Sequence, residues 1–398
     1  MRPTPRGWTL LGAGLVALQL GFAIGSPDLV RIGLVALGLV AAGTASVLVR
    51  SAQPGGRGWT VTRAVLPRRL HIGATAAVQT QLSGHGLRDV ALAERAAPQL
   101  SGAGAPRARV RRSPGVLTLD YQLHATARGR WPLGPLIATR TDPFGVIRRR
   151  GPVGATTDVL VWPTITELTL TGDVVLGEPD RVALGVRSPS PDDTALRDYH
   201  EGDDLRRVHW ASTARRGRVM VRADEHTGMR AVDVLLERPS SAAGLEWTLS
   251  VGASIALSAL TAGHPVRLLG VADDIGGYVH PRHGDDARAT LLDPTVDATT
   301  SRSPAVAGDR LVSAVNAIGH AGQVVVAVIG AVPGSARTVL AGLPAGASCW
   351  VLVRADGPTS TAAQATLHAL RQTGWHGVVA HTGEDPAEAW RRLAESAA

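Results

Sequence analysis

The sequence contains no lysine and a single cysteine, Cys349, among its 398 residues. One cysteine cannot form a disulfide within the chain, which excludes a disulfide-stapled fold and fits a reducing compartment. Without lysine there is no phosphate-binding loop of the G-x-x-x-x-G-K-S/T type, so the chain is not itself a P-loop ATPase. Aromatic residues are scarce at 4%, but a hydrophobic content of 44% excludes general disorder. Because Cys349 lies in a short apolar run, we expect it to be a small buried hydrophobic residue.

The first fifty residues hold two uncharged apolar runs, Gly7 to Ile24 and Ile32 to Val49, of 18 residues each. As a helix, each run spans about 27 Å, close to the thickness of the hydrocarbon core of a bilayer. Residues 25–28 between them, Gly-Ser-Pro-Asp, are typical of a tight turn. We therefore predict a transmembrane helical hairpin over residues 1–50. A cleaved signal peptide is the alternative interpretation of the first run.

Arginines flank the two runs unequally. Five arginines flank the outer ends of the two runs: Arg2, Arg6, Arg50, Arg57 and Arg63. Only Arg31 lies near the turn between the runs. By the positive-inside rule, both ends of the hairpin face the cytoplasm. We expect a multi-pass protein of the cell membrane with the bulk of its chain in the cytoplasm.

The rest of the chain shows two different rhythms. Residues 51–165 form short alternating segments separated by Gly, Pro and Ser turns, which predicts an all-β, sandwich-like domain. Residues 166–228 are expected to be a connecting segment. From 229 to 398, short β-branched runs alternate with helical segments, which predicts an α/β domain with a mostly parallel sheet. The fold class is therefore multidomain.

The most unusual segment of the chain is 197–222, which contains seven arginines and four carboxylates. It closely resembles the signature of the bacterial family called domain of unknown function 58 (DUF58), which runs R-x-Y-x-x-G-D-x-x-R-x-I-H-W-x-x-S/T-A-R. The residues that fall on this pattern are Arg197, Tyr199, Gly202, Asp203, Arg206, His209, Trp210, Thr213, Ala214 and Arg215. Residues 128–135, 142–145 and 159–163 also resemble the family.

This resemblance implies a membrane-anchored cytoplasmic protein with a β-domain, the signature segment and a C-terminal domain similar to von Willebrand factor A. It also implies partnership with a MoxR-type AAA+ ATPase, and no enzymatic activity is established for the family. A von Willebrand A domain usually holds a divalent metal with Asp-x-Ser-x-Ser after its first strand. Here the corresponding stretch is Glu237-Arg238-Pro239-Ser240-Ser241, in which Ser241 alone keeps type and place.

We therefore expect a degenerate metal site at Glu237 and Ser241, and a domain that works without a cofactor. Asp273 and Asp274 could add oxygen ligands, although two acidic residues after a strand are more typical of a turn or a helix cap.

The signature segment has three interpretations. Its arginines can pair with its carboxylates and lock the segment, with Trp210 as an apolar anchor. The same Arg, Tyr and Trp composition is typical of interface hot spots, which makes the segment a docking surface. As an active site it would use His200, His209, Asp203 and Asp204, but no specific reaction follows from their spacing. We expect a structural and docking role, and no catalytic residues.

The formal net charge is +8. Clusters at residues 107–112, 148–150 and 215–218 could neutralise the phosphates of a nucleic acid. In a protein tethered to a membrane, anionic headgroups of the inner leaflet explain them as well, so no nucleic-acid partner is expected. The sequence predicts a non-enzymatic membrane-anchored scaffold. The alternatives are a hydrolase-type enzyme that uses the signature segment, and a protein that binds anionic lipid or nucleic acid.

Overall fold

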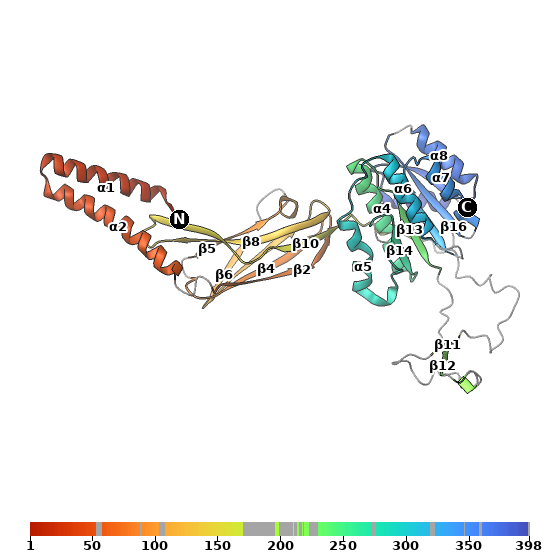
Figure 1. The fold of residues 1–398 in the computed structure, drawn as a ribbon, viewed down its shortest axis with the longest axis horizontal. Coiled ribbons are helices and arrows are strands. Elements are labelled where there is room, and N and C mark those ends of the chain that lie inside the picture. The colour runs from red at the N-terminus through yellow and green to blue at the C-terminus, as the bar shows by residue number, and fades with distance from the viewer. Residues whose placement is uncertain are drawn as a thin grey trace. The chain divides into compact units, whose positions relative to one another are not determined.

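The computed structural model of the chain describes most of the sequence (Figure 1). The described residues are 1–52, 58–87, 90–102, 108–169, 196–198, 210, 213–214, 217, 219–222, 230–272, 276–318, 323–345, 347–357 and 360–396. The chain divides into two compact units, residues 1–162 and residues 163–398.

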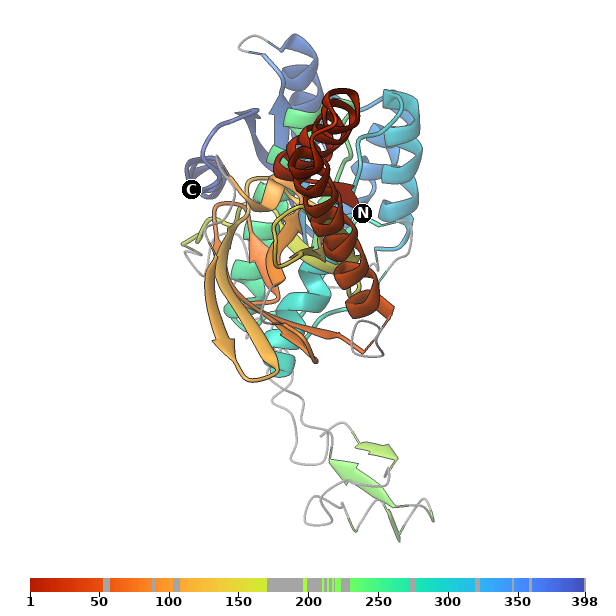
Figure 2. The same ribbon diagram turned by 90° about the vertical axis from the view of Figure 1, so that its left-hand side faces the viewer.

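The first unit begins with a helical hairpin, α1 (Pro5–Ile24) and α2 (Pro27–Ala52). The helices run side by side (Figures 1 and 2). Gly14 permits this approach, because a Cβ there would lie 3.1 Å from the Cβ of Ala36 on α2. Both helices are long and apolar enough to cross a membrane, and their apolar side chains are mostly exposed. The prediction of two membrane-length helices is confirmed.

The remainder of the first unit is β-rich, as predicted. One sheet has the order β1-β9-β8-β10-β3, with β5 also paired to β8, and a second has the order β2-β4-β7-β6. The strands are β1 (Arg2–Pro3), β2 (Thr60–Leu66), β3 (Arg69–His71), β4 (Thr75–Ser83), β5 (Val90–Ala96), β6 (Arg109–Ser113), β7 (Val116–His124), β8 (Gly129–Thr141), β9 (Ile147–Val153) and β10 (Thr157–Trp162). Alternating residues of both sheets, such as Leu82 and Leu133, belong to one buried cluster.

The second unit holds a five-stranded sheet in the order β14-β13-β15-β16-β17, in which every neighbouring pair is parallel. The strands are β13 (Val232–Leu236), β14 (Val266–Leu269), β15 (Val324–Ile329), β16 (Ser348–Ala355) and β17 (His376–His381). An antiparallel bridge joins Val266 of β14 to Val279. The predicted alternation of strands and helices, with a mostly parallel sheet, is confirmed.

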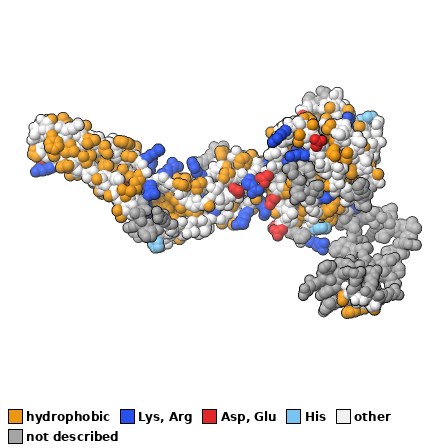
Figure 3. Space-filling view, viewed as in Figure 1, with side chains coloured by type: hydrophobic (Ala, Val, Ile, Leu, Met, Phe, Trp, Pro, Cys, Tyr) orange, Lys and Arg blue, Asp and Glu red, His pale blue; other side chains and the backbone are white. Residues whose placement is uncertain are grey.

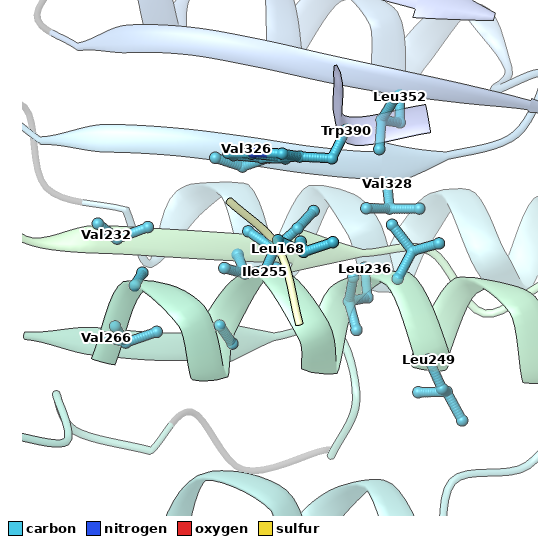
Figure 4. Packing of buried hydrophobic residues seen from close by; sticks show 14 of the residues in the cluster. Leu168, Val232, Leu236, Leu249, Ile255, Val266, Val326, Val328, Leu352 and Trp390 are labelled. Atoms are coloured by element: carbon cyan, nitrogen blue, oxygen red, sulfur yellow. The ribbon is translucent and has the colours of Figure 1, made fainter. Parts of the chain in front are cut away.

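Helices cover both faces of this sheet. They are α4 (Ala242–Thr261), α5 (Gly284–Val296), α6 (Pro304–Asn316), α7 (Gly334–Ala341), α8 (Thr361–Arg371) and α9 (Pro386–Glu395). One buried cluster lies under α4, α5 and α9, and another lies under α6, α7 and α8. Figure 4 shows side chains of the first cluster, with Leu249 and Ile255 on α4 and Val232 and Leu236 on β13. Because both faces are covered, every residue of β13 and β15 is buried.

Helix α4 is also long and apolar enough to cross a membrane, but most of it is buried inside the second unit. It is therefore a core helix. Helix α5 carries only a weak helical signal in the sequence, because Pro294 lies inside it and its composition is polar. Two short strands, β11 (Leu196–Asp198) and β12 (Met220–Arg222), pair antiparallel within the signature segment.

Candidate functional site at the carboxyl ends of the parallel strands

The strand order creates a switch point between β13 and β15. The chain leaves β13 for α4 on one face of the sheet, and leaves β15 for α7 on the other. Connections that diverge in this way leave a crevice beyond the carboxyl ends of the two strands, where ligands of doubly wound α/β domains bind. Here the crevice position is occupied by side chains of the chain itself.

Glu237, directly after β13, is the acidic residue at this point. Its Oε2 accepts a hydrogen bond from the backbone N–H of Gly330, which directly follows β15. The same oxygen lies 3.5 Å from Nη2 of Arg354, near the end of β16. Both side chains are buried, with 9% of Glu237 and 4% of Arg354 exposed. The carboxyl ends of three strands therefore meet at one ion pair.

Gly330 leaves room for this pair, because it has no side chain. A Cβ there would lie 2.7 Å from Nη2 of Arg354 and 2.8 Å from Oε2 of Glu237. Contacts this short require one of the two buried charged groups to move. The absence of a side chain at Gly330 therefore creates the space in which the ion pair is held.

The remaining nitrogens of Arg354 also have partners. Nη1 donates to Oγ1 of Thr248 on α4 at 2.9 Å, and Nε donates to Oδ1 of Asp356 at 3.1 Å. Thr382, directly after β17, donates to the same Asp356 oxygen at 2.7 Å. A buried guanidinium is stabilised when its donors are used in this way, because the cost of removing it from water is offset by several charge-assisted bonds. Arg354 thus links α4 to the ends of β13, β16 and β17.

The other residues of the 237–241 stretch are also engaged. Arg238 is buried and donates from Nη1 to the carbonyl of Val271 at 3.3 Å. Ser241 is the N-cap of α4, and its Oγ accepts from the backbone N–H of Gly244 at 3.1 Å. The hydroxyl that aligns with the metal-binding pattern therefore satisfies a helix end.

These residues do not fit a divalent cation. Mg²⁺ and Ca²⁺ require several converging oxygen ligands, whereas the Glu237 carboxylate contacts a guanidinium and the Ser241 hydroxyl caps a helix. Within the residues that the structure describes, no group of three or more His, Cys, Asp or Glu side chains could hold a metal ion. Asp273 and Asp274 lie outside the described residues.

The structure describes only part of the signature segment. Tyr199, Gly202, Asp203, Arg206, His209 and Arg215 lie outside the described residues, as do His200 and Asp204. Arg197 lies in β11, opposite Val221 of β12. Trp210 is 68% exposed, and the carbonyl of Thr213 accepts from the backbone N–H of Gly217 at 2.9 Å.

A scan against protein families identifies the second unit in part. Residues 195–330 match the family described as Protein of unknown function DUF58. The resemblance expected from the signature is confirmed over this span, which is about a third of the chain. The DUF58 match contains β13, α4, β14, α5, α6 and β15, and it ends at Gly330, the residue that binds Glu237. No curated protein matches the chain.

Sequence reasoning found Glu237 but missed its partners, Gly330 and Arg354. A signal for Arg354 exists, because Arg-Ala-Asp at 354–356 follows the apolar run Cys349 to Val353. Charged residues such as Arg354 and Asp356, at the carboxyl end of a buried parallel strand, are candidate site residues. Gly330 has no such signal, since glycine also ends many strands for reasons of turn geometry.

Proposed function

We propose that the protein is a non-enzymatic, membrane-anchored scaffold whose second unit is a metal-independent, von Willebrand A-like domain that docks a MoxR-type AAA+ ATPase. The carrying observation is the Glu237–Arg354 pair at the switch point of the sheet. A buried arginine supplies the positive charge at the point where a domain of this class would hold a cation. Such a domain can present a surface without binding a small ligand.

The von Willebrand A-like assignment draws its support from topology. The sheet is parallel, with its first strand β13 between β14 and β15, and helices cover both faces. The stretch 237–241 directly follows that first strand, which is where the Asp-x-Ser-x-Ser pattern is expected. The departures from that pattern agree with the metal-independent form.

Support for the proposed anchoring and orientation comes from the first unit. Figure 3 shows hydrophobic side chains over most of the visible surface of the hairpin. An exposed apolar surface of this extent is stable only inside a bilayer or against a partner. The arginines at the chain ends of the hairpin support a cytoplasmic location for the β-rich part of the first unit and for the second unit.

Docking is best tested with the full chain, purified in mild detergent and tagged, against a MoxR-type AAA+ ATPase of the same organism. We expect the ATPase to be retained by the wild type and lost on Trp210→Ala, because exposed Trp is enriched at interface hot spots. Trp8→Ala is the matched control, since Trp8 is a similarly exposed tryptophan of the hairpin. Equal retention by wild type and Trp210→Ala, or no retention by either, contradicts the docking proposal.

The enzyme alternative has its own test. A search for hydrolysis of phosphate and ester substrates by the purified chain is expected to detect no turnover. Turnover that is abolished by His209→Ala, in a variant that unfolds at the same temperature as the wild type, contradicts the non-enzymatic proposal.

A further inference from the structure

We propose that the turn between β8 and β9, residues 142–145, is a membrane-interface element, in which Phe144 enters the headgroup region beside the hairpin and neighbouring arginines bind anionic lipid phosphates. This inference rests on the proposed membrane anchor. It adds a second, non-spanning contact between the first unit and the bilayer.

The turn is packed directly against the hairpin. A Cβ on Gly43 of α2 would lie 2.6 Å from Cγ2 of Val146 and 3.0 Å from Oδ2 of Asp142, and one on Gly7 of α1 would overlap the Val146 carbonyl. Val146 is fully buried in a cluster with Val47 and Ile147. The hydroxyl of Thr4 donates to the carbonyl of Gly145 at 2.6 Å. These contacts fix the height of the turn along the helices.

The turn packs near the start of the apolar span of α1 and near the end of the apolar span of α2. Gly7 is the third residue of the span Pro5–Ile24, and Gly43 is six residues before the end of the span Pro27–Val49. Six helical residues correspond to about 9 Å along the axis. Interfacial segments lie with their apolar side about 5–10 Å into the headgroup and acyl boundary. The turn therefore lies at interfacial depth if the hairpin spans the bilayer.

The turn also satisfies its own polar groups. Oδ2 of Asp142 accepts from the backbone N–H of Phe144 at 2.8 Å, and Oδ1 accepts from that of Ile147 at 2.5 Å. The N–H of Gly145 donates to the Asp142 carbonyl at 3.0 Å, and the N–H of Asp142 donates to the Ile147 carbonyl at 3.0 Å. The Asp142 side chain is buried. A segment whose donors are paired internally loses little on entering a medium poor in water.

Phe144 is the apolar group that this turn presents. It is one of two phenylalanines in the chain, and 50% of it is exposed. Gly145 supports the tight turn with a φ of +71°, a region that favours glycine. Aromatic side chains are enriched at the level of the headgroups, so Phe144 at this height gains from contact with lipid.

Arginines surround the turn. Arg2 of β1 lies opposite Arg148 of β9 in the sheet register, and Arg6 precedes Gly7 on α1. Arg148, Arg149, Arg2 and Arg6 are exposed, and no carboxylate partner is seen for them in the part of the chain that the structure describes. Figure 3 shows basic side chains where the hairpin meets the β-rich part. Two like charges in facing strand positions repel each other, and an anionic phosphate between them removes that penalty.

The test places an environment-sensitive fluorophore on an introduced cysteine in the full chain, reconstituted in phosphatidylcholine nanodiscs with or without phosphatidylglycerol. The native Cys349 is 1% exposed and is not expected to react. The Phe144→Cys probe is expected to shift to the blue and to be quenched by headgroup-level nitroxide lipids. The Leu66→Cys probe is the matched control. Leu66 is 70% exposed and is the last residue of β2. The other end of β2 follows Trp59, whose ring lies under Arg140 near the turn end of β8, so Leu66 lies at the end of β2 that is far from the turn.

A third probe, Val35→Cys in α2, separates this inference from the anchor. Quenching at Val35 by acyl-chain nitroxide lipids, without quenching at Phe144 by headgroup-level ones, overturns the interfacial turn alone. Absence of quenching at Val35 by acyl-chain nitroxide lipids overturns the membrane anchor, and the inference with it. Quenching at both positions but not at Leu66 supports both.

The second part of the experiment tests the arginines by adding Arg148→Gln to the Phe144→Cys chain. The control is Arg68→Gln, which removes an exposed arginine close to Leu66. Phosphatidylglycerol is expected to strengthen quenching of the Phe144→Cys probe severalfold, and Arg148→Gln is expected to reduce that gain while Arg68→Gln retains it. If phosphatidylglycerol increases quenching equally in the Phe144→Cys chain and in its Arg148→Gln and Arg68→Gln forms, the headgroup contact is overturned. It is also overturned if phosphatidylglycerol has no effect and the chain instead binds duplex DNA at moderate salt, with this binding lost in Arg148→Gln.

Discussion

Glu237 and Arg354 are separated by more than a hundred residues in the sequence, yet their side chains lie 3.5 Å apart and are almost completely buried. Glu237 directly follows β13, and Arg354 is the next-to-last residue of β16. Gly330 directly follows β15, the strand that lies between these two in the sheet. The pair thus closes the sheet at the point where this class of fold otherwise binds a ligand. Its energetic consequences can be measured directly.

Removal of the guanidinium is expected to be strongly destabilising. Arg354→Met leaves the buried Glu237 carboxylate without its cation, which should lower the free energy of unfolding by about 3–5 kcal/mol. Glu237→Gln combined with Arg354→Met should recover part of this loss, because no buried charge remains and Gln still accepts from Gly330. Thermal unfolding of the full chain, followed by tryptophan fluorescence, measures both. Arg391→Met, on the exposed face of α9, is the control and should have no measurable effect. A double variant less stable than Arg354→Met contradicts this account.

A methyl group at position 330 should have a similar effect by a different route. Gly330→Ala places a Cβ 2.7 Å from Nη2 of Arg354, and overpacking of this kind costs about 1–3 kcal/mol. Gly334→Ala is the matched control, because a Cβ there meets no atom closer than 4.0 Å. Unfolding temperatures should therefore fall for Gly330→Ala and remain unchanged or rise for Gly334→Ala. The same fall in both variants shows that the ion pair does not restrict position 330.

Ser241 should behave as a helix cap and not as a metal ligand. Ser241→Ala is expected to lower the stability by about 1 kcal/mol, as is Ser303→Ala, which removes the equivalent cap of α6. Calorimetric titration of the full chain with Mg²⁺ or Mn²⁺ is expected to give no single-site heat. Heat that is present in the wild type and in Ser303→Ala but absent in Ser241→Ala contradicts the metal-independent site.

Alkaline pH should destabilise the second unit. Burial raises the pKa of the Cys349 thiol from its ordinary 9.0 to about 12, and it raises the pKa of Tyr278 from 10.0 to about 12. Between the unfolded and folded values, the folded state keeps a proton that the unfolded state has released. Stability is therefore fully present below pH 9 and declines as the pH rises toward 12, by up to about 1.4 kcal/mol per pH unit for each group.

Cys349→Ala isolates the thiol's share of this decline. Between pH 9 and 10 the thiol in the unfolded chain releases most of its proton, whereas Tyr278, with an ordinary pKa of 10.0, reaches half-titration only at the upper end of this window, so Cys349→Ala should lose less stability than the wild type. Tyr278→Phe should differ from the wild type only slightly in this window and clearly above pH 10. A Cys349→Ala profile parallel to the wild type from pH 9 to 10 contradicts the buried thiol as the cause.

Local patterns predicted the classes of the secondary structure well. The apolar runs, the alternation of the middle region and the strand–helix rhythm after residue 229 are each short-range properties of the chain. The sequences of strands β6 and β9, Arg-Val-Arg-Arg-Ser and Ile-Arg-Arg-Arg-Gly-Pro-Val, resemble solvated charge clusters and give little strand signal of their own. Backbone pairing to β7 and β8 makes them strands, and pairing partners cannot be inferred from side-chain periodicity.

The sequence by itself determined that the chain has two membrane-length helices, a β-rich middle and an α/β region with one unusual arginine-rich segment, since length, hydropathy and period are local. It also led to the prediction, still untested, of a degenerate metal site at Glu237 and Ser241. Only the tertiary structure decided that Arg354 lies at Glu237, and that residues 142–145 pack on Gly7 and Gly43. Both depend on the order in which strands pair and on the space that glycines leave. Neither of these is encoded within a single segment.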